Sequence, residues 1–123
     1  MCAFPSLTQA QTRPVKASYY ADGFNGRKMA NGQKFNQCRI TAASLKYPLG
    51  TVLSVRSVTT GDVILVTITD RGPWNHKYSL DLSKAAFQAL GLDLRAGWGW
   101  VTVGVEHETE GSLVVPGSLE TTP

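Results

Sequence analysis

One predicted β-hairpin most constrains what this chain can fold into. Residues 51–58 alternate apolar and polar side chains, residues 59–62 form a turn, and residues 62–69 are a β-branched, apolar run. This run stops where Asp70 opens an Asp-Arg-Gly-Pro sequence, which breaks strand pairing and forces a loop. A second acid, Asp81, follows eleven residues later in another short apolar segment. The pattern therefore sets two carboxylates at the ends of adjacent β segments, where a rigid scaffold meets exposed loops.

The rest of the chain adds short strands and one helix. We expect an aromatic strand at residues 16–21, a strand or one helical turn at 40–45, and an alternating strand at 98–105. The helix is expected at about residues 83–90, with Ser83 as its N-cap and a glycine as its stop. About six short strands with many glycine turns predict a compact all-β barrel, because closure removes the exposed edges of a small sheet.

The length and charge of the chain limit the classes of protein to which it can belong. The chain has 123 residues and 42% apolar residues, which suits one domain with a single core, here predicted at residues 16–106. Residues 1–15 are expected to be a flexible tether and residues 107–123 a mobile acidic tail. All Lys and Arg residues lie between Arg13 and Arg95. A basic body suits an anionic polymer such as a cell-wall glycan, although the scattered charges also fit an ordinary solvated surface.

Two cysteines are too few for a disulfide framework. We favour a buried free thiol for Cys38 over a bridge to Cys2. Cys2, directly after Met1, would also suit the lipidated cysteine of a lipoprotein, with residues 3–15 as its tether. The N-terminal residues do not form an intact signal peptide, so the protein is expected to be cytosolic unless a signal was removed.

Several short motifs occur in the order and spacing typical of the rare lipoprotein A (RlpA) type of double-psi β-barrel domain. They are Ala17–Tyr20, Ala30–Phe35, Thr41–Ser44, Pro48–Thr51, Thr69–Pro73 and Asp81–Ser83. The resemblance covers residues 16–106. It implies a six-stranded double-psi β-barrel, a location in the bacterial cell envelope, and action on peptidoglycan glycan strands as a lytic transglycosylase. More distantly, the chain resembles the first domain of expansins and family 45 glycoside hydrolases, in which acids matching Asp70 and Asp81 line the polysaccharide groove.

Lytic cleavage needs one carboxyl group that protonates the glycosidic oxygen and then accepts the proton of the sugar's 6-hydroxyl group. From the resemblance we expect Asp70 to be this general acid and base, with Asp81 as its electrostatic partner. Both residues could instead have structural roles, since Asp81 could cap the following helix and Asp70 could pair with Arg71 or hold the turn.

The chain departs from the active members of the family at two positions. The Glu and His that complete the family's catalytic set are replaced by Gln33 and Ser44. Glutamine cannot exchange a proton and serine is a poor base without a partner. At both positions the side chain is therefore expected only to hydrogen-bond the sugar and hold it in position. The chain could therefore bind glycan without cutting it, in the manner of expansins, or cut it through Asp70 and Asp81 alone.

Polar and aromatic residues in the motifs are expected to contact the glycan. Flat aromatic faces stack on sugar rings, and Trp74 is the best candidate for such a platform. By contrast, Trp98 and Trp100 share one strand face and are expected in the core or as barrel cover. The full predicted substrate-binding set is Ser18, Tyr20, Gln33, Ser44, Arg71 and Trp74.

Other classes of site find no support in the sequence. His76 and His107 are isolated, so no metal site is predicted, and no motif for a cofactor is present. No nucleic-acid-binding module is present either. The expected partners are peptidoglycan glycan strands and, through a lipidated Cys2, a membrane; a domain that docks to division or secretion machinery is a further alternative. We expect a monomer.

Overall fold

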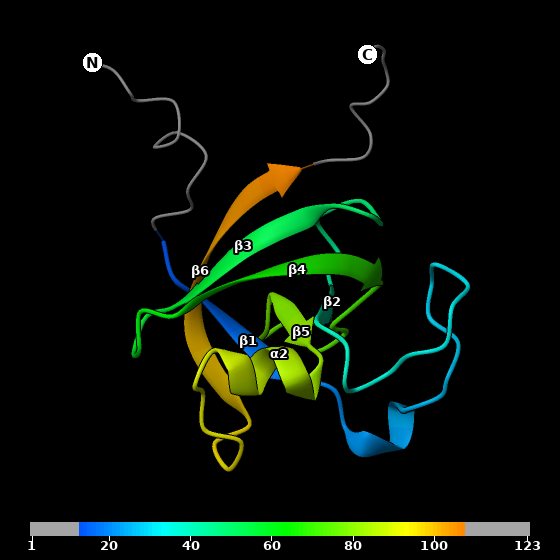
Figure 1. The fold of residues 1–123 in the computed structure, drawn as a ribbon, viewed down its shortest axis with the longest axis horizontal. Coiled ribbons are helices and arrows are strands. Elements are labelled where there is room, and N and C mark those ends of the chain that lie inside the picture. The colour runs from blue at the N-terminus through cyan, green and yellow to red at the C-terminus, as the bar shows by residue number, and fades with distance from the viewer. Residues whose placement is uncertain (1–12, 108–123) are drawn as a thin grey trace.

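The computed structural model describes residues 13–107, which form a closed barrel of six strands (Figure 1). Going around the barrel, the strands follow the order β1-β5-β2-β4-β3-β6, and β6 pairs with β1 to close it. The predicted all-β barrel with one short α-helix is confirmed. Most of the predicted tether and tail lie outside the described residues. The strands are β1 Val15–Tyr19, β2 Thr41–Ala43, β3 Val52–Ser57, β4 Val63–Asp70, β5 Leu80–Leu82 and β6 Trp98–His107.

The predicted hairpin is strands β3 and β4, which pair antiparallel from Val52 with Thr67 to Arg56 with Val63. Their alternation turns Leu53 into the barrel, where it is fully buried. The segment that sequence alone left open between strand and helical turn is strand β2. It lies between β5 and β4, antiparallel to the first and parallel to the second.

Helix α2, Lys84–Ala89, packs against the barrel core through Phe87, which is fully buried (Figure 1). Its predicted N-cap is confirmed, because the Ser83 hydroxyl accepts a hydrogen bond of 3.2 Å from the backbone N–H of Ala86. The same hydroxyl donates to the carbonyl of Arg39. Ser83 therefore fixes the helix start against the segment that leads into β2.

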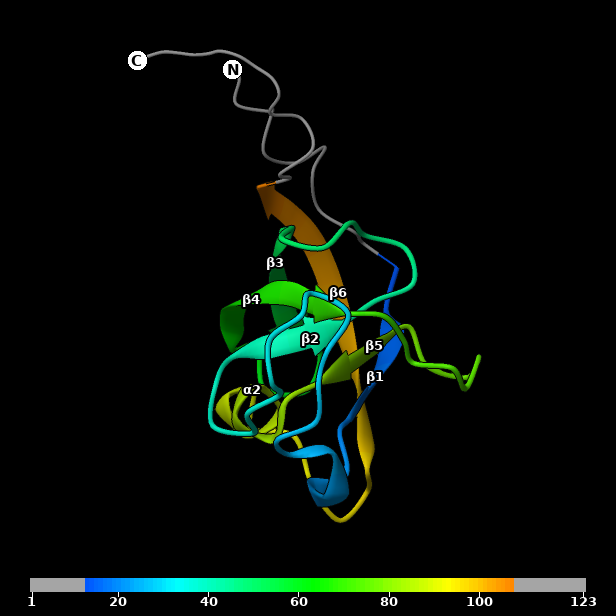
Figure 2. The same cartoon turned by 90° about the vertical axis from the view of Figure 1, so that its right-hand side faces the viewer.

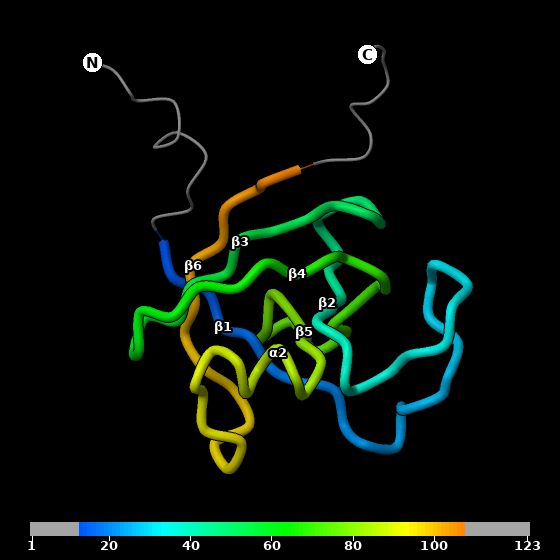
Figure 3. The backbone as a smooth tube through the Cα atoms, viewed as in Figure 1, coloured from blue at the N-terminus to red at the C-terminus, as the bar shows by residue number. Residues whose placement is uncertain are grey.

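A second, smaller cluster of buried side chains lies outside the main core. Tyr20, Met29, Phe35 and Ala43 form it, and the rings of Tyr20 and Phe35 stack with centroids 4.0 Å apart. The cluster anchors the long segment between β1 and β2, which begins with the 3-10 helix η1, Asp22–Phe24, and arches beside the barrel (Figures 2 and 3). This segment is rich in glycine and asparagine over residues 25–36. Within residues 13–107, no helix is long and apolar enough to cross a membrane.

Candidate functional site

The two predicted acids lie on strands that are consecutive in the chain but are not neighbours in the barrel. Strand β2 separates β4 from β5, and Ala43 of β2 is the register partner of Asp70 on one side and of Asp81 on the other. Asp81 is in turn the register partner of Ser18 on β1. Because register partners on paired strands point to the same face of a sheet, these four residues form one row across the outside of the barrel.

The carboxylate of Asp70 is held by three hydrogen-bond donors. Its Oδ2 accepts from the hydroxyl of Tyr20 at 2.8 Å, and its Oδ1 accepts from the backbone N–H groups of Ala30 and Arg71 at 2.8 and 2.9 Å. Burial, reinforced by the neighbouring Asp70 carboxylate, raises the pKa of Tyr20 well above its usual range, so its hydroxyl stays a donor. Asp70 thus ties β4 to β1 and to the long loop.

The predicted pairing of Asp70 with Arg71 is present only as the hydrogen bond that the backbone N–H of Arg71 donates to Asp70. The guanidinium Nη2 of Arg71 instead donates to the carbonyl of Tyr47 at 2.6 Å. Arg71 therefore joins the loop after β4 to the loop after β2, and its side chain lies in the wall of the groove described below.

Asp81 has a different environment. Its side chain is largely buried, and its Oδ1 accepts one hydrogen bond, of 3.1 Å, from the hydroxyl of Ser18. Burial, aided by the negative charge of Asp70, raises the pKa of Asp81 to about 6, although the Ser18 hydrogen bond acts in the opposite direction. Asp81 does not cap the helix, since Ser83 performs that role. Its carboxyl group can therefore carry a proton at a pH where ordinary carboxyl groups are ionised.

Both acids line an open groove with a cavity volume of about 460 Å³. Aromatic side chains line it as well, and Trp74 is 72% exposed there. Trp74 follows Gly72, whose φ of 133° lies in the region that favours glycine. Of the predicted site residues, the groove brings together Ser18, Tyr20, Asp70, Arg71, Trp74 and Asp81.

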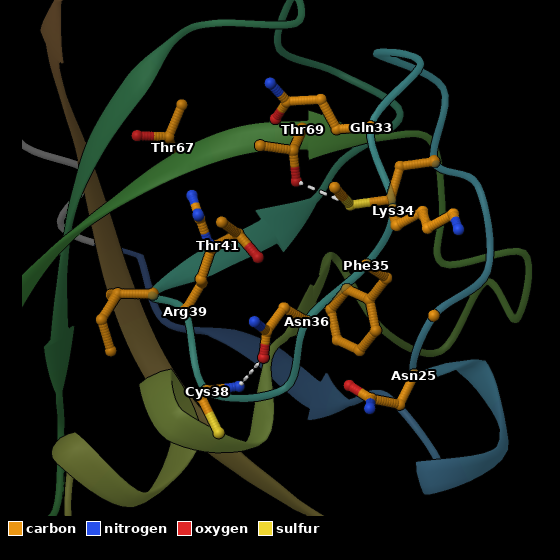
Figure 4. A pocket seen from close by; sticks show the side chains of 13 residues that line it. Asn25, Gln33, Lys34, Phe35, Asn36, Cys38, Arg39, Thr41, Thr67 and Thr69 are labelled. Carbon is orange, nitrogen blue, oxygen red and sulfur yellow. Dashed lines mark hydrogen bonds between the residues drawn. The ribbon is translucent and has the colours of Figure 1, made fainter.

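Gln33 does not line this groove. It faces a separate, larger cavity of about 960 Å³ between the long loop and the threonines of β2 and β4 (Figure 4). Lys34 and Arg39 lie in the same wall. Cys38 also lines this cavity and is exposed, so the prediction of a buried thiol is wrong. The reason is that the loop residues around Cys38 face solvent; any contact with Cys2 lies outside the described residues.

Ser44 is fully buried and lines a third cavity, of about 240 Å³. Its hydroxyl accepts hydrogen bonds from the backbone N–H groups of Lys46 and Tyr47, at 3.0 and 3.1 Å, and so holds a turn. This cavity shares Pro73 and Tyr78 with the groove. Ser44 is thus next to the groove, behind one of its walls.

Of the two places predicted for the tryptophans of β6, the core is wrong, and cover on the outside of the barrel fits. Neither belongs to the buried core, and Trp100 is 43% exposed. The inward position between them is Gly99, where an added Cβ would lie 2.6 Å from a methyl group of Leu92. Because Leu92 fills the inner side of the strand at Gly99, the two indoles lie on the outer face. The glycine between two tryptophans was the available signal. Among residues 13–107, no three His, Cys, Asp or Glu side chains are grouped to hold a metal ion.

Comparison with known structures supports the architecture. The barrel is similar to the crystal structure of a Clavibacter michiganensis expansin, with a TM-score of 0.61 and 24% identity over 80% of this chain and 50% of that one. It is also similar to a Streptomyces papain inhibitor, with a TM-score of 0.60 and 22% identity over 79% of this chain and 97% of the inhibitor. At these identities the likeness concerns the fold alone.

Proteins related in sequence narrow the family further than the likeness of folds does. The chain is 43% identical over 76 residues to a Synechocystis protein named probable endolytic peptidoglycan transglycosylase RlpA, covering 62% of this chain and 24% of that protein. It is 38% identical over 91 residues to the Haemophilus influenzae endolytic peptidoglycan transglycosylase RlpA, covering 74% of this chain and 31% of the relative. The chain thus spans about a quarter to a third of the length of these relatives.

The family model described as lytic transglycolase matches residues 12–103, which include strands β1 to β5 in full, the first part of β6 and every residue of the groove. The chain therefore belongs to the lytic transglycolase family of RlpA-like double-psi β-barrels.

Proposed function

We propose that this domain binds peptidoglycan glycan strands in the groove and cleaves them by lytic transglycosylation, with Asp81 as the proton donor. The observation that carries the proposal is the environment of Asp81: a largely buried carboxyl group in an open groove, with its pKa raised to about 6. A general acid works best when its pKa lies near the pH of the reaction. The names of the relatives supply the substrate class.

The reaction follows from one carboxyl group. Protonated Asp81 gives its proton to the glycosidic oxygen, and the bond between that oxygen and the anomeric carbon breaks as positive charge develops on the sugar ring. The Asp81 carboxylate then takes the proton of the sugar's 6-hydroxyl group, whose oxygen bonds to the anomeric carbon and closes an anhydro ring. No water is consumed, and Asp81 ends protonated, ready for another cycle.

This assignment reverses the roles that the sequence suggested for the two acids. Both oxygens of Asp70 already accept hydrogen bonds, from Tyr20, Ala30 and Arg71, so Asp70 suits a fixed anion better than a proton carrier. As an anion it has two uses. It holds the long loop in place, and its charge favours the protonated form of Asp81 and the positive charge that develops on the sugar.

Trp74 is the residue best suited to stack on a sugar ring, because most of its side chain is exposed at the groove. Ser18 contacts Asp81 directly and so positions the reacting group. The hydroxyl of Tyr20 and Nη2 of Arg71 donate hydrogen bonds within the protein, which assigns these two residues to shaping the groove.

A second candidate function is glycan binding without cleavage. The observation that favours it is the fate of the two substituted positions. Gln33 faces a different cavity and cannot exchange a proton, while the Ser44 hydroxyl is buried and occupied with a turn. If family chemistry requires Glu and His at these positions, the groove retains only its affinity for sugars.

The relatives also support a place in the bacterial cell envelope, where their named substrate is found. We further propose that a lipid is attached to Cys2 and that the protein is a monomer. The closed barrel favours a monomer because it leaves no sheet edge for strand pairing between copies. Mass spectrometry of membrane-extracted protein tests the anchor, and an unmodified Cys2 would contradict it.

The test of the proposed function uses purified sacculi, with and without stem peptides, incubated with wild type and Asp81→Asn. Soluble products are identified by mass, and protein that pellets with the sacculi is measured in parallel. Anhydro-sugar products from wild type, absent with Asp81→Asn at equal pelleting, are expected. Pelleting without products would favour the binding module, and the absence of both would overturn glycan recognition altogether.

A further inference from the structure

We propose that Trp98 and Trp100, together with Lys16, form a second glycan-binding surface that continues the groove along the outside of β6 and β1. This surface is called the tryptophan platform below. The inference rests on the proposed function, because its occupant is the same glycan strand, extending beyond the sugars at the acids. It adds a binding site on a face of the barrel that the groove itself does not include.

Strand register joins the platform to the groove. Trp98 on β6 is the register partner of Ser18 on β1, and Ser18 is the register partner of Asp81 on β5. The three side chains therefore lie in one row on one face of the sheet. In the strand order of the barrel, β1 lies between β5 and β6. Two strand spacings, about 10 Å, separate the backbone of Trp98 from that of Asp81, which is the scale of a disaccharide.

The two indoles are held outside the core by the packing beneath them. Leu92 fills the inner side of the strand at Gly99, where an added side chain would force Leu92 to move. Trp100 is left 43% exposed, and the two rings meet edge to face with centroids 5.6 Å apart. An exposed tryptophan beside a half-buried one forms an apolar surface patch, and such a patch is a common mark of a binding surface.

Lys16 supplies charge at the same place. Its Nζ lies 4.9 Å from the ring centroid of Trp98 and 5.5 Å from that of Trp100. Among residues 13–107, Lys16 forms no ion pair with an acidic side chain, since the ion pair in this range joins Lys84 and Asp22. Cation–π contacts at exposed sites are weak and readily exchanged. The ammonium group can therefore leave the rings when a sugar stacks on them.

These features identify the occupant by its chemistry. Aromatic faces suit the apolar faces of sugar rings, and a free ammonium group suits a carboxylate carried by the same strand. Peptidoglycan strands without stem peptides have this combination, since every second sugar carries a lactyl carboxylate. Together with Trp74, the platform places aromatic side chains on both sides of Asp81 along the path of the bound glycan.

The test measures binding of short and long peptidoglycan oligosaccharides without stem peptides, by calorimetry, in an Asp81→Asn background that prevents cleavage. The short ligand fills the groove alone and the long ligand also reaches the platform. We expect the double change Trp98→Ala with Trp100→Ala to weaken binding of the long ligand about tenfold, equivalent to about 1.4 kcal/mol, and to leave the short ligand unchanged. Phe at both positions should restore most of the loss.

Two further variants sharpen the result. Lys16→Gln keeps the aliphatic stem and should lower affinity only for long ligands with free carboxylates, with a weaker dependence on salt. Leu65→Ala, at a 57% exposed apolar side chain on the outside of β4, is the matched control and should change nothing. Circular dichroism and thermal unfolding check that all variants are folded.

The outcomes distinguish a failure of the tryptophan platform from a failure of the proposed function. If the long ligand binds as tightly to the tryptophan and lysine variants as to their parent, the platform is overturned and the groove stands. If the parent binds neither ligand, the proposed function fails first and takes this inference with it.

Discussion

The hydroxyl of Ser18 donates a hydrogen bond of 3.1 Å to Oδ1 of Asp81, its register partner on the neighbouring parallel strand. This hydrogen bond stabilises the ionised Asp81 carboxylate, and it partly offsets the rise in pKa that burial causes. The acid strength of Asp81, which burial mainly determines, can therefore be tuned through the Ser18 side chain.

Ser18→Ala should move the pH dependence of cleavage. Removing the hydroxyl removes a stabiliser of the ionised carboxylate, so the pKa of Asp81 rises further. The alkaline limb of the pH profile, where the proton donor is lost, should then shift to higher pH than in wild type. The profile is measured as anhydro-sugar release between pH 4 and 8. A limb that stays in place would contradict the role of Ser18, and Ser18→Thr, which retains a hydroxyl, is the matched control.

Asp70→Asn should weaken both the loop and the acid. An amide has one acceptor oxygen, so at least one of the donors from Tyr20, Ala30 and Arg71 loses its partner, at a cost of about 1.5–3 kcal/mol in unfolding free energy. Loss of the Asp70 charge should also lower the pKa of Asp81. Thermal unfolding and hydrogen exchange at the Ala30 amide measure the first effect. Asp62→Asn, on an exposed aspartate, serves as control.

Folding stability should fall as the pH rises from about 4 to 6. The pKa of Asp81 is raised in the folded state above its ordinary value of 3.8, so over this interval the folded protein binds more protons than the unfolded chain. Ionisation of Asp81 therefore costs stability, on the order of 3 kcal/mol at neutral pH. Asp81→Asn should remove this contribution and be the more stable protein at pH 7. Urea unfolding at several pH values measures it; a variant less stable than wild type at pH 7 would contradict the burial account.

Local patterns in the sequence were sufficient for the hairpin β3–β4, the helix α2 and its Ser83 cap. Each depends on residues close together in the chain, where alternation, turn residues and caps act directly. The number of strands and the closed barrel followed from the same signals, and the family motifs supplied the double-psi type of barrel.

The environment of the acids depends on contacts between distant residues. Strand β2 lies between β4 and β5, and the pKa of Asp81 depends on its burial and on Ser18, 63 residues away. Neither fact is contained in the spacing of Asp70 and Asp81. The sequence therefore indicated both acids but could not decide which of them would have the raised pKa.

The sequence left the position of Trp98 and Trp100 open for a similar reason. Aromatic residues in an alternating strand are usually buried, but here Leu92 packs against the inner side of Gly99 and the tryptophans lie on the outer face. Likewise, the motifs that contain Gln33 and Ser44 matched the family, while only the folded chain could place these residues outside the groove.

The most direct test of Asp81 as the proton donor is a titration of its side-chain carboxyl carbon by NMR, with Asp70→Asn as the comparison. We expect a midpoint near pH 6 in wild type, and a lower midpoint in Asp70→Asn because the neighbouring negative charge is gone. A wild-type midpoint near 4, the ordinary range of an aspartate, would contradict the assignment and leave the groove without a proton donor.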